Sequence, residues 1–254
     1  MKSIKVLTLN TWMREGPYEQ RRRLIQEWIE TLQPDLIGFQ EVEETQTSEL
    51  LDGLGYEHTW HSGLSVASRW EFEDINHFDL PSFDDALSSG GPVLATKLST
   101  PTGSVPFINA TTYHYLLRHG WQRESQMPAL NEYLQSRRID GGYPIILVGD
   151  FNAVPESNEH RYMRGLNSID GTSTFYTDAW EVHNGQSSGA TWSTENAYAS
   201  IYGLPDRRID YIYVASMGVS GPGAVLDCRV VCNEEKGGVW PSDHFGVYAE
   251  LSAT

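Results

Sequence analysis

The segment Pro144-Ile145-Ile146-Leu147-Val148-Gly149-Asp150-Phe151-Asn152 contains the most apolar run of the chain and ends in polar residues. A continuous apolar run of this length, with Pro before it and Gly at its end, is typical of a strand that is buried on both faces. The segment therefore predicts a central strand in a covered sheet, with Asp150 and Asn152 at the point where the strand ends.

The first forty residues predict a strand, a helix and a second strand. Ile4–Asn10 alternates so that Ile4, Val6, Thr8 and Asn10 share one face. Glu19–Leu32 has an apolar stripe at helical spacing and is followed by Pro34, which stops a helix. Asp35–Glu41 is again apolar, so this region predicts the strand–crossover–strand unit of a sheet covered by helices.

The rest of the chain predicts further strands and one long helix. Short apolar runs at 64–67 and 93–98 lie between Gly, Ser and Pro clusters, which favours antiparallel strands and loops. Further strands are expected at 107–115, 208–214, 224–231 and 245–251, and a helix at 122–138 despite Pro128. No internal repeat or low-complexity linker interrupts the pattern, so we expect one compact domain over residues 1–254.

The composition is that of a soluble globular protein: 254 residues, 39% hydrophobic, 20% charged, with a net charge of −16. This acidity argues against a polyanion clamp, which needs clustered Lys and Arg, but not against a nuclease whose metal supplies the positive charge. No apolar run is long enough to span a membrane. The chain enters its first strand without a signal peptide, which predicts a cytoplasmic protein unless a leader has been removed, in which case it is secreted. The sequence predicts no oligomeric state.

The two cysteines, Cys228 and Cys232, exclude a disulfide scaffold and a four-cysteine zinc site. On the strand expected there, positions four apart lie about 13 Å from each other. That separation is too large for a disulfide, so both thiols are expected to be reduced.

Polar residues stand at the ends of the strands that are expected to be buried. They are Asn10, Glu41, Asp150, Asn152, Asp210, Asp243 and His244. Groups at the ends of several strands of a sheet can converge on one crevice, although they are far apart in the sequence. A buried carboxylate costs several kcal/mol unless a hydrogen bond, an ion pair or a metal compensates it.

Two of these local motifs have a functional and a purely structural interpretation. If the chain is extended, Asp150 and Asn152 point to the same side, where the acid can position a water and the amide can hold a phosphate; the alternative is an Asx turn that closes the strand. In Ser242-Asp243-His244, we expect Asp243 to face a metal and His244 to face the substrate, oriented by Asp210. The alternative is a surface turn.

Single residues have structural alternatives too. Glu41 could be the partner of an arginine, Asn10 could cap a loop, and His114, in a strand rich in Thr and Tyr, could be a hydrogen-bonded structural histidine.

Taken together, these motifs resemble the endonuclease/exonuclease/phosphatase superfamily, which includes pancreatic-type deoxyribonuclease, abasic-site endonucleases, neutral sphingomyelinases and inositol polyphosphate 5-phosphatases. The matching segments follow the family order over nearly the whole chain: 8–12, 40–42, 63–70, 149–153, 191–192, 208–212 and 242–244. The resemblance implies an α/β (α+β) fold, a four-layer sandwich of two mixed β-sheets packed face to face with helices on both outer sides. It also implies a hydrolase that cuts phosphate esters with a divalent cation.

The resemblance also implies roles for single residues. Glu41 is then the principal metal ligand, with Asn10 and Asp243 near the metal. Asp150 positions or deprotonates the water, and Asn152 holds a phosphate oxygen. His244, backed by Asp210, contacts the phosphate; whether Asp150 or His244 is the base stays open.

The segment after the middle strand departs from the family pattern, because Tyr113-His114 stands where Thr-His or Asn-His is common. A slip of one residue exchanges the two faces of a strand, so either Tyr113 or His114 faces the site. We favour His114 as a catalytic residue.

The ligand chemistry favours a hard cation. Oxygen ligands without cysteines suit Mg²⁺ or Mn²⁺, with Ca²⁺ as an alternative, and one or two ions are compatible with the sequence. Zinc is disfavoured because no His/Cys cluster has its spacing. His58-Thr59-Trp60-His61 is the nearest approach to one, and we interpret these histidines as decoration of a strand.

The expected substrate is a small-molecule or lipid-like phosphoester, which makes the protein a phosphodiesterase of sphingomyelinase-like type. Between Glu71 and Asp85 there are six acidic residues and no Lys or Arg. If this stretch flanks the cleft, it repels a long polyanion; otherwise it is a solvated loop. The basic run Arg21–Arg23 is interpreted as a solvated helix face.

An endonuclease acting on DNA or RNA is the alternative function, so a nucleic acid partner is not favoured but stays open. A third hypothesis is a catalytically dead binding module on the same fold.

Overall fold

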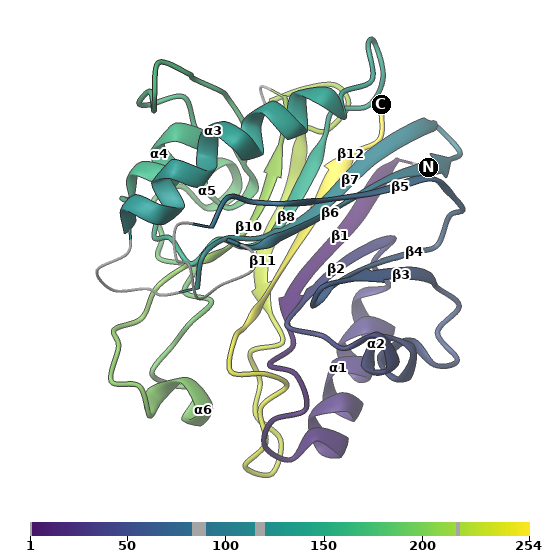
Figure 1. The fold of residues 1–254 in the computed structure, drawn as a ribbon. Coiled ribbons are helices and arrows are strands. Elements are labelled where there is room, and N and C mark those ends of the chain that lie inside the picture. Colours follow the sequence, from purple (N-terminus) through teal and green to yellow (C-terminus); the bar gives the residue numbers. More distant parts are fainter. Residues whose placement is uncertain (1, 83–89, 115–119, 217–218) are drawn as a thin grey trace.

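The computed structural model describes residues 2–82, 90–114, 120–216 and 219–254. Two six-stranded sheets pack face to face, and helices lie on their outer sides (Figure 1). The predicted four-layer sandwich of two mixed sheets is therefore confirmed. No helix within the described ranges is long and apolar enough to cross a membrane.

The first sheet has the strand order β11-β12-β1-β2-β4-β3. Its strands are β1 (Ser3–Asn10), β2 (Leu36–Gln40), β3 (Glu57–His61), β4 (Leu64–Ser68), β11 (Val225–Val231) and β12 (Gly246–Ser252). Strands β1 and β2 are parallel, as the predicted crossover requires, and the other pairs are antiparallel.

The second sheet has the order β5-β6-β7-β8-β10-β9. Its strands are β5 (Phe72–Asp79), β6 (Pro92–Thr100), β7 (Gly103–Thr111), β8 (Ile146–Asp150), β9 (Thr177–Asp178) and β10 (Asp210–Val214). Strand β7 runs parallel to β8, and the other pairs are antiparallel.

Strand β8 is a central strand, as its apolar run predicts. Every residue of β8 is buried, because Ile146 and Val148 pack against the first sheet and Leu147 packs against the outer helices. Gly149 has a φ of 146°, and a Cβ there would lie 1.8 Å from the carbonyl oxygen of Ala110. Only glycine fits this position, so Gly149 brings β8 close to β7 directly before Asp150.

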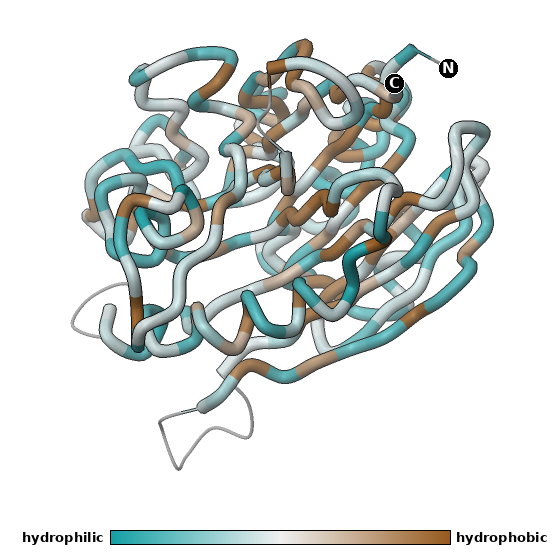
Figure 2. The backbone as a smooth tube through the Cα atoms, turned by 90° about the horizontal axis from the view of Figure 1, so that it is seen from above, coloured by the Kyte–Doolittle hydropathy of each residue, from teal (hydrophilic) through white to brown (hydrophobic). Residues whose placement is uncertain are grey.

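The helices cover the outer faces of the two sheets. Helices α1 (Tyr18–Leu32) and α2 (Glu44–Leu51) share an apolar cluster with the first sheet, and α3 (Gly120–Ser136) and α4 (Asn158–Met163) share one with the second. Helix α5 (Ala179–Asn184) packs against β10 and β11, and α6 (Ala197–Ser200) lies in a long connection. Hydrophobic segments accordingly lie mostly inside the molecule when it is viewed from above (Figure 2).

Some local predictions need correction. The strand expected at 107–115 ends at Thr111, so Tyr113 and His114 follow β7 instead of belonging to it, and Tyr115 lies outside the described residues. The acidic stretch is not a solvated loop where it is described, because Phe72–Asp79 forms the edge strand β5. Cys228 and Cys232 are buried free thiols, as expected.

Candidate active site

The polar strand ends of both sheets meet at one end of the sandwich. Asn10 ends β1, and Glu41 follows the parallel strand β2. Asp210, the first residue of β10, is paired with Asp150, the last residue of β8, because these strands are antiparallel. His244 comes just before β12, which is antiparallel to β1. Strand direction alone therefore gathers these residues.

A hydrogen bond between the two sheets joins two of the predicted site residues. Asn10 Nδ2 donates to Asp150 Oδ2 at 3.2 Å, and both side chains are buried. Asn10 Oδ1 accepts from the backbone N–H of Trp12 at 3.0 Å. Asn10 thus closes the loop after β1, as the structural alternative held, and also orients the Asp150 carboxylate.

The turn after β8 differs from the extended conformation that would place Asp150 and Asn152 side by side. Asn152 has a φ of 50°, and its backbone N–H donates to Asp150 Oδ1 at 2.9 Å. This is the Asx turn of the alternative interpretation. Asn152 remains buried beside the site, with Nδ2 3.4 Å from the carbonyl oxygen of Thr112.

Asp210 and His244 form the expected carboxylate–imidazole contact. Nδ1 of His244 lies 3.0 Å from Asp210 Oδ2, and both residues are buried. The Trp192 ring meets the imidazole edge to face, with 5.0 Å between ring centroids. Burial lowers the pKa of His244, but the charge and hydrogen bond of Asp210, with the charges of Asp243 and Asp150, outweigh it and raise the pKa well above its ordinary value.

The site concentrates negative charge. Burial, and then the neighbouring Asp210, raise the pKa of Asp150 to about 7, and Glu41 adds to the effect. The pKa of Asp243 is also raised, by burial first and by Glu41, although His244 opposes the rise. Carboxylates held together in this way are stabilised by a cation.

The residues present fit a hard divalent cation. Asp210 Oδ1 is buried and has no hydrogen-bond partner among the described residues, and ligand atoms of Asp150, Asp210 and His244 lie within 4.8 Å of one another. Both Asp150 oxygens and Asp210 Oδ2 already accept or share hydrogen bonds. Glu41 is half-buried and forms no ion pair with any described arginine, so its carboxylate is not neutralised by one. The compact trio thus differs from the predicted ligands Glu41, Asn10 and Asp243, which lie next to it.

Tyr113 and His114, which follow β7, differ in their exposure to solvent. Tyr113 is buried and its backbone N–H donates to Gln126, whereas His114 is exposed. Their ring centroids are 5.7 Å apart. The catalytic role of His114 stays a prediction.

A buried polar network beneath the site was not anticipated. Gln40 Nε2 donates to Thr8 Oγ1 at 2.9 Å and to Asn109 Oδ1 at 2.7 Å, and Asn109 Nδ2 donates to the carbonyl oxygens of Phe39 and Ser65. All three side chains are fully buried. The alternation of Thr8 with Asn10 on one strand face was the signal that could have revealed part of it.

Arg21 was wrongly placed on a solvated helix face. Its side chain is fully buried and donates to the backbone carbonyls of Thr11, Met13 and Glu15, and its guanidinium lies over the Trp12 ring. It thereby holds the loop that follows Asn10. The position four residues before Ile25, on the buried stripe of α1, was the overlooked signal.

The fold and the order of these motifs along the chain are those of a class of phosphoester hydrolases. The sequence profile of the endonuclease/exonuclease/phosphatase family matches residues 7–244, and the chain belongs to this family.

Among curated relatives, the chain is 25% identical to nocturnin from Rattus norvegicus over 263 residues and 25% identical to nocturnin from Homo sapiens over 265 residues. These alignments cover 92% and 93% of this chain but 59% of each relative, so the chain spans about three-fifths of their length.

Two solved structures show the same fold. The structure of D. rerio TDP2 complexed with single-strand DNA product has a TM-score of 0.78 at 16% identity and covers 99% of both chains. The human nocturnin catalytic domain with bound sulfate anion has a TM-score of 0.74 at 22% identity, covering 100% of this chain and 94% of that one.

Proposed function

We propose that this protein is a divalent-metal-dependent phosphodiesterase that acts on small or lipid-like phosphoesters. The observation that carries the proposal is the convergence of Asp150, Asp210 and His244, from β8, β10 and the segment before β12, at the end of the sandwich where Asn10 also lies. Oriented carboxylates beside an imidazole are the groups that hydrolysis of a phosphate ester uses.

Each of these side chains has a role that its contacts support. Asp150 is oriented by Asn10 and by the N–H of Asn152, so its carboxylate is held to accept a proton from the attacking water. His244, held at Nδ1 by Asp210, presents Nε2–H to a phosphoryl oxygen. Glu41 and Asp243, with Asn10, would hold the cation, which supplies positive charge against the phosphoryl oxygens when bound.

The arginines support a small substrate over a long polyanion. Arg21 is buried against backbone carbonyls, Arg22 pairs with Glu19, and Arg123 pairs with Glu159. A nucleic acid needs several cations that are available for its phosphates. These three arginines are engaged within the protein, whereas Arg23 is exposed and Arg118 lies outside the described residues.

The acidic stretch gives this proposal less support than the sequence suggested. Strand direction puts Asp79 at the site end of β5 and Glu73 and Asp74 at the opposite end. Glu73 pairs there with Lys97, and Asp74 lies 3.7 Å from Arg137. These two charges therefore do not repel a ligand at the site.

Cleavage of a nucleic acid is the second candidate, because D. rerio TDP2, which shares the fold, was solved with a single-strand DNA product. A substrate panel separates the two functions. Phosphate mono-, di- and triesters, sphingomyelin, single-stranded DNA and duplex DNA are each assayed with Mg²⁺, Mn²⁺ and Ca²⁺ at about 50 and 200 mM salt, where phosphate contacts lose most of their affinity.

We expect small diesters to be hydrolysed with a higher kcat/KM than DNA shows per bond, with a weak dependence on salt. The Asp150→Asn protein, purified identically, reveals contaminating activity. Faster cleavage of DNA with a steep salt dependence would assign the nuclease function instead, and no hydrolysis of any ester would favour a binding module.

A further inference from the structure

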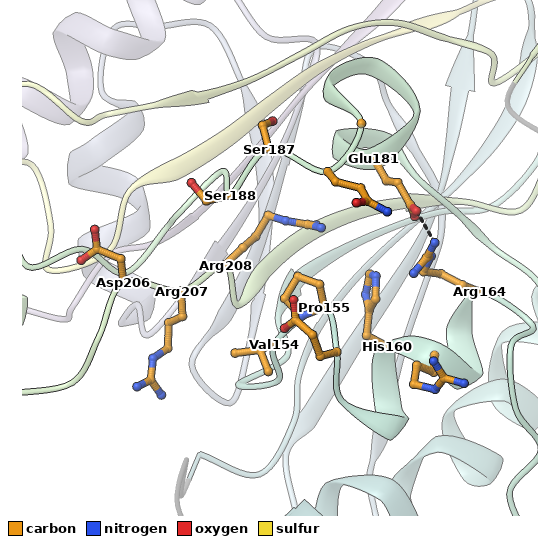
Figure 3. Close-up of a pocket in the computed structure, with 14 residues that line it drawn as sticks. Val154, Pro155, His160, Arg164, Glu181, Ser187, Ser188, Asp206, Arg207 and Arg208 are labelled. Carbon is orange, nitrogen blue, oxygen red and sulfur yellow. Dashed lines mark hydrogen bonds and ion pairs between the residues drawn. The ribbon is translucent and has the colours of Figure 1, made fainter.

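A cavity of about 520 Å³ lies between α4, α5 and the segment 206–208, and none of the predicted site residues lines it (Figure 3). Its lining comes from Val154–Glu156, from α4, from the loop after α5 and from Asp206–Arg208. Arg208 approaches it from the segment before β10, and His160 and Arg164 approach it from α4 and its C-terminal end (Figure 3). This cavity has no role in the proposed hydrolysis.

Four arginines line the cavity although the chain has a net charge of −16: Arg161, Arg164, Arg207 and Arg208. Arg164 pairs with Glu181, and Arg208 pairs with Asp178 at 2.7 Å. Arg161 is exposed and Arg207 half-buried, and neither forms an ion pair with another described residue. Arg207 Nε donates to the carbonyl oxygen of Pro205 at 3.2 Å, so its remaining N–H groups and the guanidinium of Arg161 are available to a ligand. Guanidinium is the group that binds a phosphate through paired hydrogen bonds.

A buried donor without a partner also faces the cavity. Nε of Arg208, which is 5% exposed, has no hydrogen-bond partner among the described residues. The neighbouring His160 is held within the protein, because its Nδ1 lies 2.7 Å from the Tyr213 hydroxyl and its Nε2 lies 3.5 Å from Asp178 Oδ2. A buried donor without a partner destabilises the protein, so a ligand that accepts from it binds favourably.

The local charges favour an anion over a cation. Ligand atoms of His160, Asp178 and Glu181 lie within 4.8 Å of one another, as in a metal site. However, each of the two carboxylates is already paired with an arginine. Burial, followed by the charges of Arg208 and Arg164, lowers the pKa of His160 to about 2. The imidazole is therefore neutral, and the guanidinium charges around it favour an anionic ligand.

We propose that this cavity is an anion-binding site that takes the phosphate group of a small phosphorylated molecule, separately from the catalytic cluster. Arg161 and Arg207 bind the phosphate at the rim, and Arg208 Nε donates from below. Glu156 and Asp206, exposed carboxylates that also line the cavity, oppose binding and limit its strength. The inference does not depend on the proposed hydrolysis.

Titration calorimetry of the metal-free full chain with inorganic phosphate tests the site. We expect the double variant Arg161→Gln/Arg207→Gln to bind at least about tenfold more weakly, which corresponds to the loss of charge-assisted hydrogen bonds. Glu156→Gln should bind more tightly, because it removes a repulsive charge from the same rim. Arg23→Gln, which changes an exposed arginine of α1, should bind as the unchanged protein does.

A variant of the catalytic cluster separates the two sites. His244→Gln should retain the phosphate affinity, since His244 does not line the cavity. Loss of binding in His244→Gln with no change in the double variant would place the anion in the catalytic cluster and overturn the proposal. Mn²⁺ binding that requires His160, without phosphate binding, would overturn it as well.

Discussion

Replacing Asp210 by Asn should slow the reaction without unfolding the protein. The substitution retains the size of the side chain and the backbone pairing of β10 with β8, but it removes the charge 3.0 Å from His244 Nδ1. A hydrogen bond to a charged group contributes about 1.5–3 kcal/mol. If that contribution acts in the transition state, kcat falls roughly 10- to 150-fold at 1.36 kcal/mol per factor of ten. KM should change little, because the imidazole stays in place.

The pH profile distinguishes this role from a structural one. Asp210 helps to raise the pKa of His244, so the pKa should fall in Asp210→Asn, and activity that depends on the protonated ring should be lost at a lower pH. Steady-state kinetics over pH 5–10, on the best ester of the panel, measure both effects. Asp227→Asn, which changes a half-buried carboxylate on β11, is the matched control. A decrease in kcat below about threefold with an unshifted pH profile would refute the assigned role of Asp210.

Four further outcomes are expected. Excess chelator should abolish hydrolysis and Mg²⁺ or Mn²⁺ should restore it; full activity in chelator would exclude the metal. Glu41→Ala should weaken Mn²⁺ binding, measured by calorimetry, with little loss of fold because it relieves repulsion with Asp150 and Asp243; unchanged affinity would place the ion elsewhere. Asp150→Asn should lower kcat at least about 10²-fold, the scale of general acid–base groups, and near-normal turnover would mean that water is activated by another group. His160, whose pKa is about 2 in the folded chain, should make the protein about 2 kcal/mol less stable at pH 5 than at pH 7, because the unfolded chain takes up a proton as the pH falls through about 6.5. Urea unfolding should show a smaller loss in His160→Gln, and equal losses in both proteins would contradict the buried neutral ring.

The fold was predictable where a buried face requires apolar residues at regular spacing along the sequence. The apolar run of β8 and the alternation of β1 each give a buried strand, and the stripe of α1 gives its inner face. The convergence of the candidate site residues followed from the same information, because polar residues at the ends of neighbouring strands lie at one edge of the sheets. Strand direction then brought Asp210 opposite Asp150.

The remainder depended on interactions that no local pattern records. Asn152 has a positive φ, and its backbone N–H donates a hydrogen bond to the Asp150 side chain. The chain therefore turns at this point instead of continuing in the expected extended conformation. Arg21 belongs to a run of three arginines and was therefore expected to be solvated. Its guanidinium instead donates to three backbone carbonyls in the interior. The residues that line the arginine-rich cavity are spread over the sequence from 154 to 208. Their positive charges could therefore not be recognised as a cluster in a chain whose net charge is negative.

The polar network between the sheets explains how a site built from two sheets is held in register. Apolar faces alone tolerate small shifts, because one methyl group can replace another at little cost. Gln40 and Asn109 cannot shift in this way, since each must keep its hydrogen bonds in a dry interior, and an unmet bond there costs about 1–3 kcal/mol. Their bonds therefore fix one alignment of β2 against β7. The same alignment carries Asn10 to within 3.2 Å of Asp150, so the network that supports the site also determines its geometry.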